Sequence, residues 1–152
     1  MQAKLKFTLF SLLLAAVILT ACAPAADVPS GGEPILVVSG GEVSVEYTAA
    51  DLEALGPVQA TFKDVTYLGI PLTVLLEDAG FDPAALRAVK VVALDGYSVN
   101  YEPDFFLLPD TLVSYARLDA PLAEDELPFR MVLPAAEGKM NVRQLTEVQA
   151  IP

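Results

Sequence analysis

From residue 35 to the end of the chain, short β-rich segments alternate with turn-forming residues, and this alternation constrains the fold more than any other feature. Residues 35–38 and 42–47 flank Gly40-Gly41 and predict a β-hairpin. Residues 89–94 are almost entirely apolar, which predicts a strand in the interior of a sheet. Further strands are predicted at residues 58–62, 65–68, 97–101, 111–116 and 129–133, with residues 142–151 as a closing segment.

Helix signals are fewer and cover shorter stretches. Thr48 and Asp51 have the spacing of a capping box, which predicts the start of a short helix. Pro71 suits the first position of a second helix, because leucine and alanine then recur at helical spacing as far as Gly80. Glycine at that point is typical of a left-handed C-terminal cap. A third short helix is predicted over residues 82–86.

Pattern and composition together indicate one folded domain. The chain has 152 residues, and 54% of them are hydrophobic, which argues against intrinsic disorder. No internal repeat or second linker interrupts residues 35–152. Because strands outnumber the short helices, we expect a single compact α+β domain of mixed β-sheet with short helices.

The residue types that are missing exclude several functions. The chain has no histidine, which rules out Ser-His-Asp and Cys-His nucleophile systems and an ordinary zinc enzyme. A single cysteine rules out an intramolecular disulfide and a Cys-only iron–sulfur site. The formal net charge of −11 argues against a nucleic-acid partner, because binding to a phosphate backbone needs clustered Lys and Arg.

That single cysteine, Cys22, follows an export signal. Lys4 and Lys6 precede an apolar run over residues 7–21, which is too short to span a bilayer and is typical of a secretory signal. The run ends in Leu19-Thr20-Ala21-Cys22, which resembles the lipobox of bacterial lipoproteins. The alternative is a plain signal peptide, or a membrane anchor, with an incidental cysteine. The resemblance implies cleavage after residue 21 and acylation of Cys22.

This interpretation divides the chain into three parts. Residues 1–21 are the predicted lipoprotein signal peptide, residues 22–34 the lipidated N-terminus and flexible tether, and residues 35–152 the domain. The signal holds two of the nine basic residues and none of the twenty acidic ones, so its removal lowers the formal net charge from −11 to −13. We expect an exported protein that is lipid-anchored to the bacterial cell membrane or envelope.

Four motifs in order carry a resemblance to a known family. They are YLGIPL with LLEDAG at residues 67–80, VVALDGY at 91–97, LPFRMVLP at 127–134 and GKMNVRQL at 138–145. Together they resemble the molybdopterin-binding oxidoreductase domains, which have the sulfite-oxidase fold. The similarity covers about residues 42–151. It implies a sulfite-oxidase-like molybdopterin-binding fold for this domain.

The resemblance has consequences for catalysis. In active members, a cysteine in the segment before the "GvpL" motif binds molybdenum through its thiolate. The matching stretch here, residues 57–68, reads PVQATFKDVTYL and has no cysteine. The family's cofactor-contacting histidines are missing as well. We therefore expect no catalytic residue, no metal site and no bound cofactor, and a molybdopterin-type cofactor remains possible as the alternative.

The resemblance also implies candidate ligand-binding residues. Asn141 and Arg143 match the family's Ser and Lys near the pterin phosphate, and arginine can hold a phosphate through two hydrogen bonds. Arg130 is a second cation at a matching position, and Asp95 lies in the Asp-Gly-Tyr motif. The alternatives are that Asp95 only forms a turn and that both arginines pair with surface carboxylates.

Two other segments are ambiguous. Residues 124–126 (EDE) suggest a calcium site or, as we expect from the missing ligand spacing, a solvated loop. Residues 105–108 (FFLL) are either an exposed partner-binding patch or, as we expect, mostly core.

The function expected from all these observations is a membrane-anchored, non-catalytic binding or scaffold module of the cell envelope. The alternatives are an oxidoreductase or redox subunit that still binds a molybdopterin-type cofactor, and a small-anion binding protein. An envelope protein and a small anionic ligand are the candidate partners besides the membrane.

Overall fold

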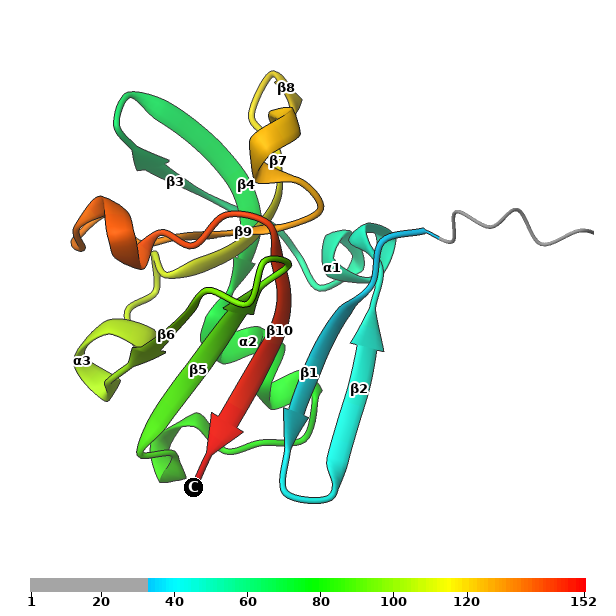
Figure 1. Cartoon of the computed structure of the whole chain (residues 1–152), viewed down its shortest axis with the longest axis vertical. Helices are drawn as coiled ribbons and strands as arrows, with labels where there is room; N and C mark the ends of the chain where they lie inside the picture. Colours follow the sequence, from blue (N-terminus) through cyan, green and yellow to red (C-terminus); the bar gives the residue numbers. More distant parts are fainter. Residues whose placement is uncertain (1–32) are drawn as a thin grey trace, which may run out of the picture. The chain divides into compact units, whose positions relative to one another are not determined.

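Five strands form a mixed sheet in the computed structural model, which describes residues 33–152 (Figure 1). β1 and β10 run parallel, with Val38 opposite Val148, and the other neighbouring strands are antiparallel. The first and last strands of the domain therefore lie side by side. The order across the sheet is β2 (Val43–Tyr47), β1 (Leu36–Gly40), β10 (Leu145–Ile151), β5 (Ala88–Ala93) and β6 (Ser98–Tyr101).

The second sheet is antiparallel throughout. Its order is β3 (Val58–Phe62), β4 (Val65–Pro71), β7 (Leu112–Arg117) and β8 (Ala120–Pro121), and β9 (Arg130–Val132) also pairs with β7. In Figure 1 the β3–β4 hairpin projects above the first sheet. The predicted α+β class with short helices is confirmed, and the strands divide into two sheets, of which one is mixed.

The helices are short, as predicted. α1 (Ala49–Ala54) begins with the predicted capping box: the Thr48 hydroxyl accepts from the Asp51 backbone N–H at 3.2 Å, and the Asp51 carboxylate accepts from the Thr48 backbone N–H at 2.8 Å. The other helices are α2 (Leu72–Asp78), α3 (Pro103–Phe106) and the 3₁₀ turns η1 (Pro83–Ala85), η2 (Glu124–Glu126) and η3 (Gly138–Met140).

The prediction for the start of α2 needs one correction. Pro71 is the last residue of β4 and the N-cap of α2, not its first helical residue, because β4 extends farther than the sequence pattern indicated. The end of the helix is as predicted, since Gly80 has a φ of 92°. The backbone N–H groups of Gly80 and Phe81 donate to the carbonyls of Glu77 and Leu76, which closes the helix in a Schellman motif.

One apolar core joins the two sheets and α2. The fully buried side chains of the helix, Leu72, Leu75 and Leu76, pack in one cluster with residues from both sheets. β4 and β7 contribute Ile70 and Val113, and the first sheet contributes Leu36, Val38, Val89, Val91 and Val148. Burial of each such side chain stabilises the fold by about 1.5–3 kcal/mol relative to an exposed position.

Two apolar segments divide between core and surface. In residues 105–108 Phe106 is fully buried and Phe105 packs against the core, whereas Leu107 is 43% exposed. The expectation of a core position therefore holds for the two phenylalanines and not for Leu107. β5 is an interior strand, as predicted, but it ends at Ala93, and Leu94 is 68% exposed.

The predicted signal peptide and Cys22 lie outside the described residues, as does nearly all of the tether. Within residues 33–152, no helix has the length and apolar composition needed to cross a membrane. Residues 33–152 form one compact unit.

Candidate functional site

Two surface hollows share η3 and the residues that directly follow it. Both are lined by Gly138, Lys139, Asn141 and Arg143, which belong to the GKMNVRQL motif. The first hollow opens toward the turn between β5 and β6, and the second toward the β3–β4 hairpin and β9. A segment far along the chain is thereby brought beside two strand turns, which local sequence patterns do not indicate.

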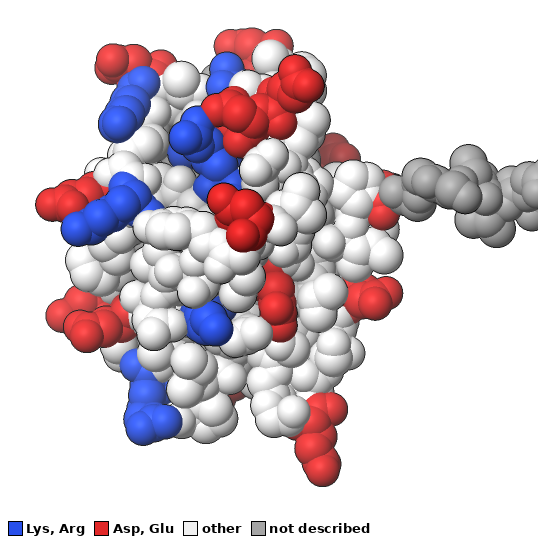
Figure 2. All heavy atoms as spheres, in the orientation of Figure 1, with Lys and Arg blue, Asp and Glu red and all other residues white. Residues whose placement is uncertain are grey.

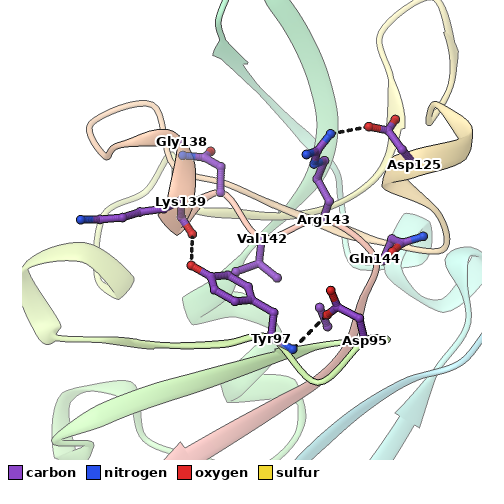
Figure 3. Close-up of a pocket in the computed structure, with 10 residues that line it drawn as sticks. Asp95, Tyr97, Asp125, Gly138, Lys139, Val142, Arg143 and Gln144 are labelled. Carbon is purple, nitrogen blue, oxygen red and sulfur yellow. Dashed lines mark hydrogen bonds and ion pairs between the residues drawn. The ribbon is translucent and has the colours of Figure 1, made fainter.

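The polar side chains that line the first hollow form hydrogen bonds and an ion pair within the protein (Figure 3). The Asp95 carboxylate accepts from the backbone N–H of Tyr97 at 2.9 Å, which fixes the turn between β5 and β6. The Tyr97 hydroxyl donates to the Lys139 carbonyl at 2.9 Å and ties this turn to η3. Arg143 points away from Asp95 and forms an ion pair with Asp125. The polar groups of this hollow are largely paired with one another.

The second hollow gathers positive charge. Lys63, Arg130, Lys139 and Arg143 all line it, and its volume is about 440 Å³. The Lys63 ammonium lies 5.4 Å, and the Arg130 guanidinium carbon 5.9 Å, from the centre of the Phe62 ring, which also lines the hollow. In Figure 2 most of the visible Lys and Arg side chains lie in the upper half of the molecule, the part that contains the β3–β4 hairpin in Figure 1.

A buried charge cluster forms the floor of the second hollow. One oxygen of Glu126 accepts hydrogen bonds from the Tyr67 hydroxyl at 2.8 Å and from Arg130. The other oxygen accepts from Arg117 Nε at 3.0 Å and from the Ala123 backbone N–H at 2.9 Å. Glu126 and Arg130 are each about 95% buried, so their mutual pairing replaces the water that both charges have lost.

This cluster corrects the expectation for residues 124–126. The solvated-loop interpretation is wrong for Glu126, which is 4% exposed and holds two arginines. Asp125 pairs with Arg143 at the surface. The reason lies in the tertiary structure. η2 turns one of three adjacent acidic residues inward, toward Arg117 on β7 and Arg130 on β9. Nothing in the sequence of the segment indicates which of the three acids is buried.

The cluster fixes the protonation of its members. Burial alone would raise the pKa of Glu126, but hydrogen bonds from Ala123 and Tyr67 and the charge of Arg130 outweigh it, so this pKa lies below its ordinary value. The pKa of Tyr67 is raised, first by burial and then by its hydrogen bond to the Glu126 carboxylate. At neutral pH the cluster therefore holds a carboxylate and a neutral phenol.

Asn141 is committed to the local backbone. Its side-chain oxygen accepts from the Leu133 backbone N–H at 2.7 Å, and its amide nitrogen donates to the carbonyls of Leu133 and Glu137, each at 3.2 Å. The residue is 4% exposed. Asn141 therefore shapes the loop before η3, and both of its donor hydrogens already have acceptors.

The four predicted ligand residues divide between the two hollows. Asp95 lines the first, Arg130 the second, and Asn141 and Arg143 line both, so no single hollow includes all four. Asp95 forms a turn and Arg143 pairs with a surface carboxylate, and both contacts agree with the alternatives to ligand binding. Arg130 has a different partner, because Glu126 is buried. Ligand binding by these residues stays a prediction.

Sequence reasoning did not identify Lys63 and Lys139 as site residues. Lys63 is at the tip of the hairpin that the two strand patterns at 58–62 and 65–68 predicted, so its place in a turn was foreseeable. What could not be foreseen is that this tip faces η3. Lys63 and Gly138 lie close together, because a Cβ atom at Gly138 would be 3.4 Å from the Lys63 ammonium.

The metal end of a molybdopterin-type cofactor does not fit these residues. The stretch expected to supply a thiolate, residues 57–68, forms most of the β3–β4 hairpin and contains no cysteine. Among residues 33–152, no three His, Cys, Asp or Glu side chains lie close enough to hold a metal ion. The second hollow offers Lys and Arg, which suit an anionic group such as phosphate and do not bind a metal cation.

Comparisons with known proteins agree with this fold. The crystal structure of the sulfane dehydrogenase SoxCD from Paracoccus pantotrophus is similar, with a TM-score of 0.61 and 19% sequence identity. The match covers 78% of this chain but 38% of that one, so the chain spans well under half of the length of SoxCD. No curated protein matches the chain. The model of the oxidoreductase molybdopterin binding domain matches residues 38–152. The chain therefore belongs to the family of molybdopterin-binding oxidoreductase domains, with a sulfite-oxidase-like fold.

Proposed function

We propose that the protein is a lipid-anchored envelope protein whose domain is a non-catalytic ligand-binding module. The observation that carries this proposal is a contrast between two segments, the one expected to bind the metal and the one expected to lie near the cofactor phosphate. The stretch that would supply the metal-binding thiolate is a β-hairpin without cysteine, whereas the GKMNVRQL motif borders a hollow lined by four cations. The fold is retained and the donor set has changed, which favours binding over redox chemistry.

The metal content of the protein tests the non-catalytic part of this proposal. The full-length protein is produced in a host that makes molybdenum cofactor, purified in detergent and assayed for molybdenum and pterin. We expect no stoichiometric molybdenum, because no residue of the domain supplies a thiolate. One molybdenum per chain would overturn the proposal and favour the second candidate, a subunit that positions the cofactor while the cofactor does the chemistry.

The second candidate has one observation in its favour. The motif at residues 138–145 keeps a cation, Arg143, where family members have a Lys near the pterin phosphate, and this residue lines both hollows. Pterin without metal in the purified protein would support cofactor binding by this route. Pterin at less than one-hundredth of the protein concentration, with no metal, would contradict it.

Lipid anchoring rests on the sequence around Cys22 and has its own test. Cys22→Ser should abolish labelling by a radioactive or alkyne-tagged fatty acid and should release the domain from the membrane fraction, because the serine hydroxyl does not accept the lipid. Ser30→Ala, in the predicted tether, is the matched control and should leave both properties unchanged. Unchanged membrane retention of the Cys22→Ser protein would mean that the uncleaved apolar segment holds it.

A further inference from the structure

One end of the first sheet is the end at which the chain enters the domain. β1 and β10 run parallel with Val37 opposite Glu147, so Ile35 lies beside the start of β10. β10 and β5 run antiparallel with Leu145 opposite Ala93, so β5 finishes at the same end. In Figure 1 β1 and β10 both point away from this end, and the C-terminus lies at the opposite end of the sheet. Three strands thus place a start or a finish side by side.

Large apolar side chains are exposed at this end. Leu94 is 68% exposed, more than any other large hydrophobic residue of the described chain, and Ile35 and Leu127 are 44% and 45% exposed. Gln144 lies between two of them: its carbonyl accepts from the Leu94 backbone N–H at 2.8 Å, and its N–H donates to the carbonyl of Glu126 at 3.3 Å. Ile35 and Leu94 are two strand spacings apart, about 10 Å. We name Ile35, Leu94 and Leu127 the entry edge.

The charged groups around the entry edge are mainly acidic. Glu33 and Asp95 are exposed and form no ion pair within residues 33–152. The nearby cation, Arg143, is paired with Asp125. Single exposed apolar residues are ordinary on a protein surface, but three at one edge indicate a contact surface. Its partner is therefore apolar and does not depend on negative charge.

The predicted lipid limits the distance between this edge and a membrane. Cys22 is eleven residues before Glu33, and eleven fully extended residues span at most about 40 Å. Ile35 follows Glu33 by two residues, so the entry edge is the part of the sheet that is nearest to Cys22 along the chain. The turn at Gly40 and Gly41 lies at the other end of β1, about 16 Å farther away.

We propose that the entry edge docks on the lipid bilayer that holds Cys22, with Ile35, Leu94 and Leu127 inserted among the headgroups and the first part of the acyl chains. This inference rests on the lipid anchor of the proposed function and names the surface that the domain turns toward the membrane. The anchor keeps the domain at a high effective concentration beside the bilayer. Removal of three apolar side chains from water is then sufficient to orient it.

The absence of tryptophan from the chain allows a direct test. Leu94→Trp and Leu127→Trp each introduce a single fluorophore at the entry edge. The full-length protein is purified in detergent and reconstituted into phosphatidylcholine vesicles, with or without bromine on the acyl chains near the headgroups. We expect bromine to lower the fluorescence of both proteins about twofold, because docked apolar side chains reach about 5–10 Å into the interface.

Val43→Trp is the matched control. Val43 is 42% exposed, and it pairs with Gly40 beside the turn at the opposite end of β1. Brominated lipid should leave the fluorescence of this protein unchanged. Addition of phosphatidylglycerol to the vesicles should not increase the quenching of the Leu94→Trp protein, because acidic groups surround the entry edge.

A further substitution tests the contribution of Leu94 itself. Leu94→Asp, made in the Leu127→Trp protein, should remove at least about half of the quenching, because a carboxylate is costly to bring into the apolar part of the interface. Leu107→Asp in the same protein is the control. Leu107 is 43% exposed and follows α3, which comes after β6 at the far end of β5, so its substitution should not change the quenching.

Three results would overturn the inference. They are equal quenching of the Leu94→Trp and Val43→Trp proteins, unchanged quenching after Leu94→Asp, and an increase with phosphatidylglycerol, which would mean that Lys and Arg side chains direct the docking. Fatty-acid labelling of the same preparation separates this proposal from the proposed function. Labelled protein with equal quenching refutes the docking alone, whereas unlabelled protein overturns the anchor and the docking together.

Discussion

A single carboxylate, Glu126, pairs with two arginines, of which Arg130 lines the second hollow of the candidate site. Arg130 is buried and Arg117 is one-third exposed, and each donates to a different oxygen of Glu126. A buried charge that loses its partner costs far more than the pair contributes, because its hydration is already gone. Glu126 is thus needed to keep the Arg130 side chain buried beside the second hollow.

Replacement of this carboxylate should be strongly destabilising. We expect Glu126→Gln to lower the free energy of unfolding by about 3 kcal/mol, because it leaves Arg130 buried without a counter-charge. Urea unfolding followed by circular dichroism measures the change. Glu124→Gln, two residues away in the same turn and exposed, is the matched control and should change it by less than about 0.5 kcal/mol. Equal effects of the two substitutions would contradict the role of Glu126.

Acid should weaken the fold through the same residue. The pKa of Glu126 is lower in the folded protein than its ordinary value of 4.5. Its contribution to the free energy of unfolding is therefore complete above pH 4.5 and is lost as the pH falls through the pKa of the folded state. We expect the free energy of unfolding to decline below about pH 4.5. Urea unfolding between pH 7 and pH 3 should show a shallower decline for Glu126→Gln than for the unsubstituted protein. Parallel pH profiles would exclude Glu126 as a source of the dependence.

Residue roles were the least predictable part of the site, for a physical reason. The sequence pattern correctly indicated that Asp95 lies in a turn, because an Asx turn is formed by neighbouring residues. The partners of Arg130 and Asn141 were not predictable. Tyr67 is 63 residues from Arg130, and the contacts of Asn141 depend on how the loop before η3 folds.

At the scale of elements, the backbones of β4 and β7 approach each other closely at Gly69. A Cβ atom at Gly69 would lie 2.4 Å from the Val113 carbonyl oxygen and 2.7 Å from the Ser114 Cα atom. The β4–β7 pairing shifts register at this point, between Leu68 and Gly69. Glycine in the YLGIPL motif is therefore required by packing between strands.

Two glycines that flank the same helix should respond differently to alanine. Gly69→Ala should lower the free energy of unfolding by about 3 kcal/mol, because rigid backbone atoms occupy the place of the added methyl group. Gly80→Ala should cost about 1 kcal/mol, since a positive φ is the obstacle and no atom lies within 4 Å of the new Cβ. Urea unfolding compares the two. A cost for Gly80→Ala as large as that for Gly69→Ala would contradict this explanation.

Elements with local signals were predicted well, and those without them were not. The β1–β2 hairpin, the capping box of α1 and the glycine cap of α2 each depend on residues close in sequence. The split into two sheets depends on pairings such as β1 with β10, whose partners are more than 100 residues apart. The bend into η3 that creates both hollows likewise has no local signature.

At the scale of the whole molecule, the distribution of charge distinguishes the hollow from its surroundings. The formal net charge is −11 with a sequence pI of about 4.2, yet cations gather at the second hollow. A strong net charge makes the folded state repel itself, and salt screens this repulsion over distances of about 10 Å. The few exposed ion pairs act in the opposite direction but are individually weak.

Sodium chloride should therefore stabilise this protein at neutral pH. Between about 20 mM and 300 mM NaCl at pH 7, we expect the melting temperature to rise by about 3 °C, because screening relieves repulsion among the acidic side chains. Differential scanning calorimetry of the full-length protein in a neutral detergent measures the rise. The same experiment near pH 4.2, where positive and negative charges balance, should show no rise. A melting temperature that falls with salt at pH 7 would mean that ion pairs outweigh the net charge.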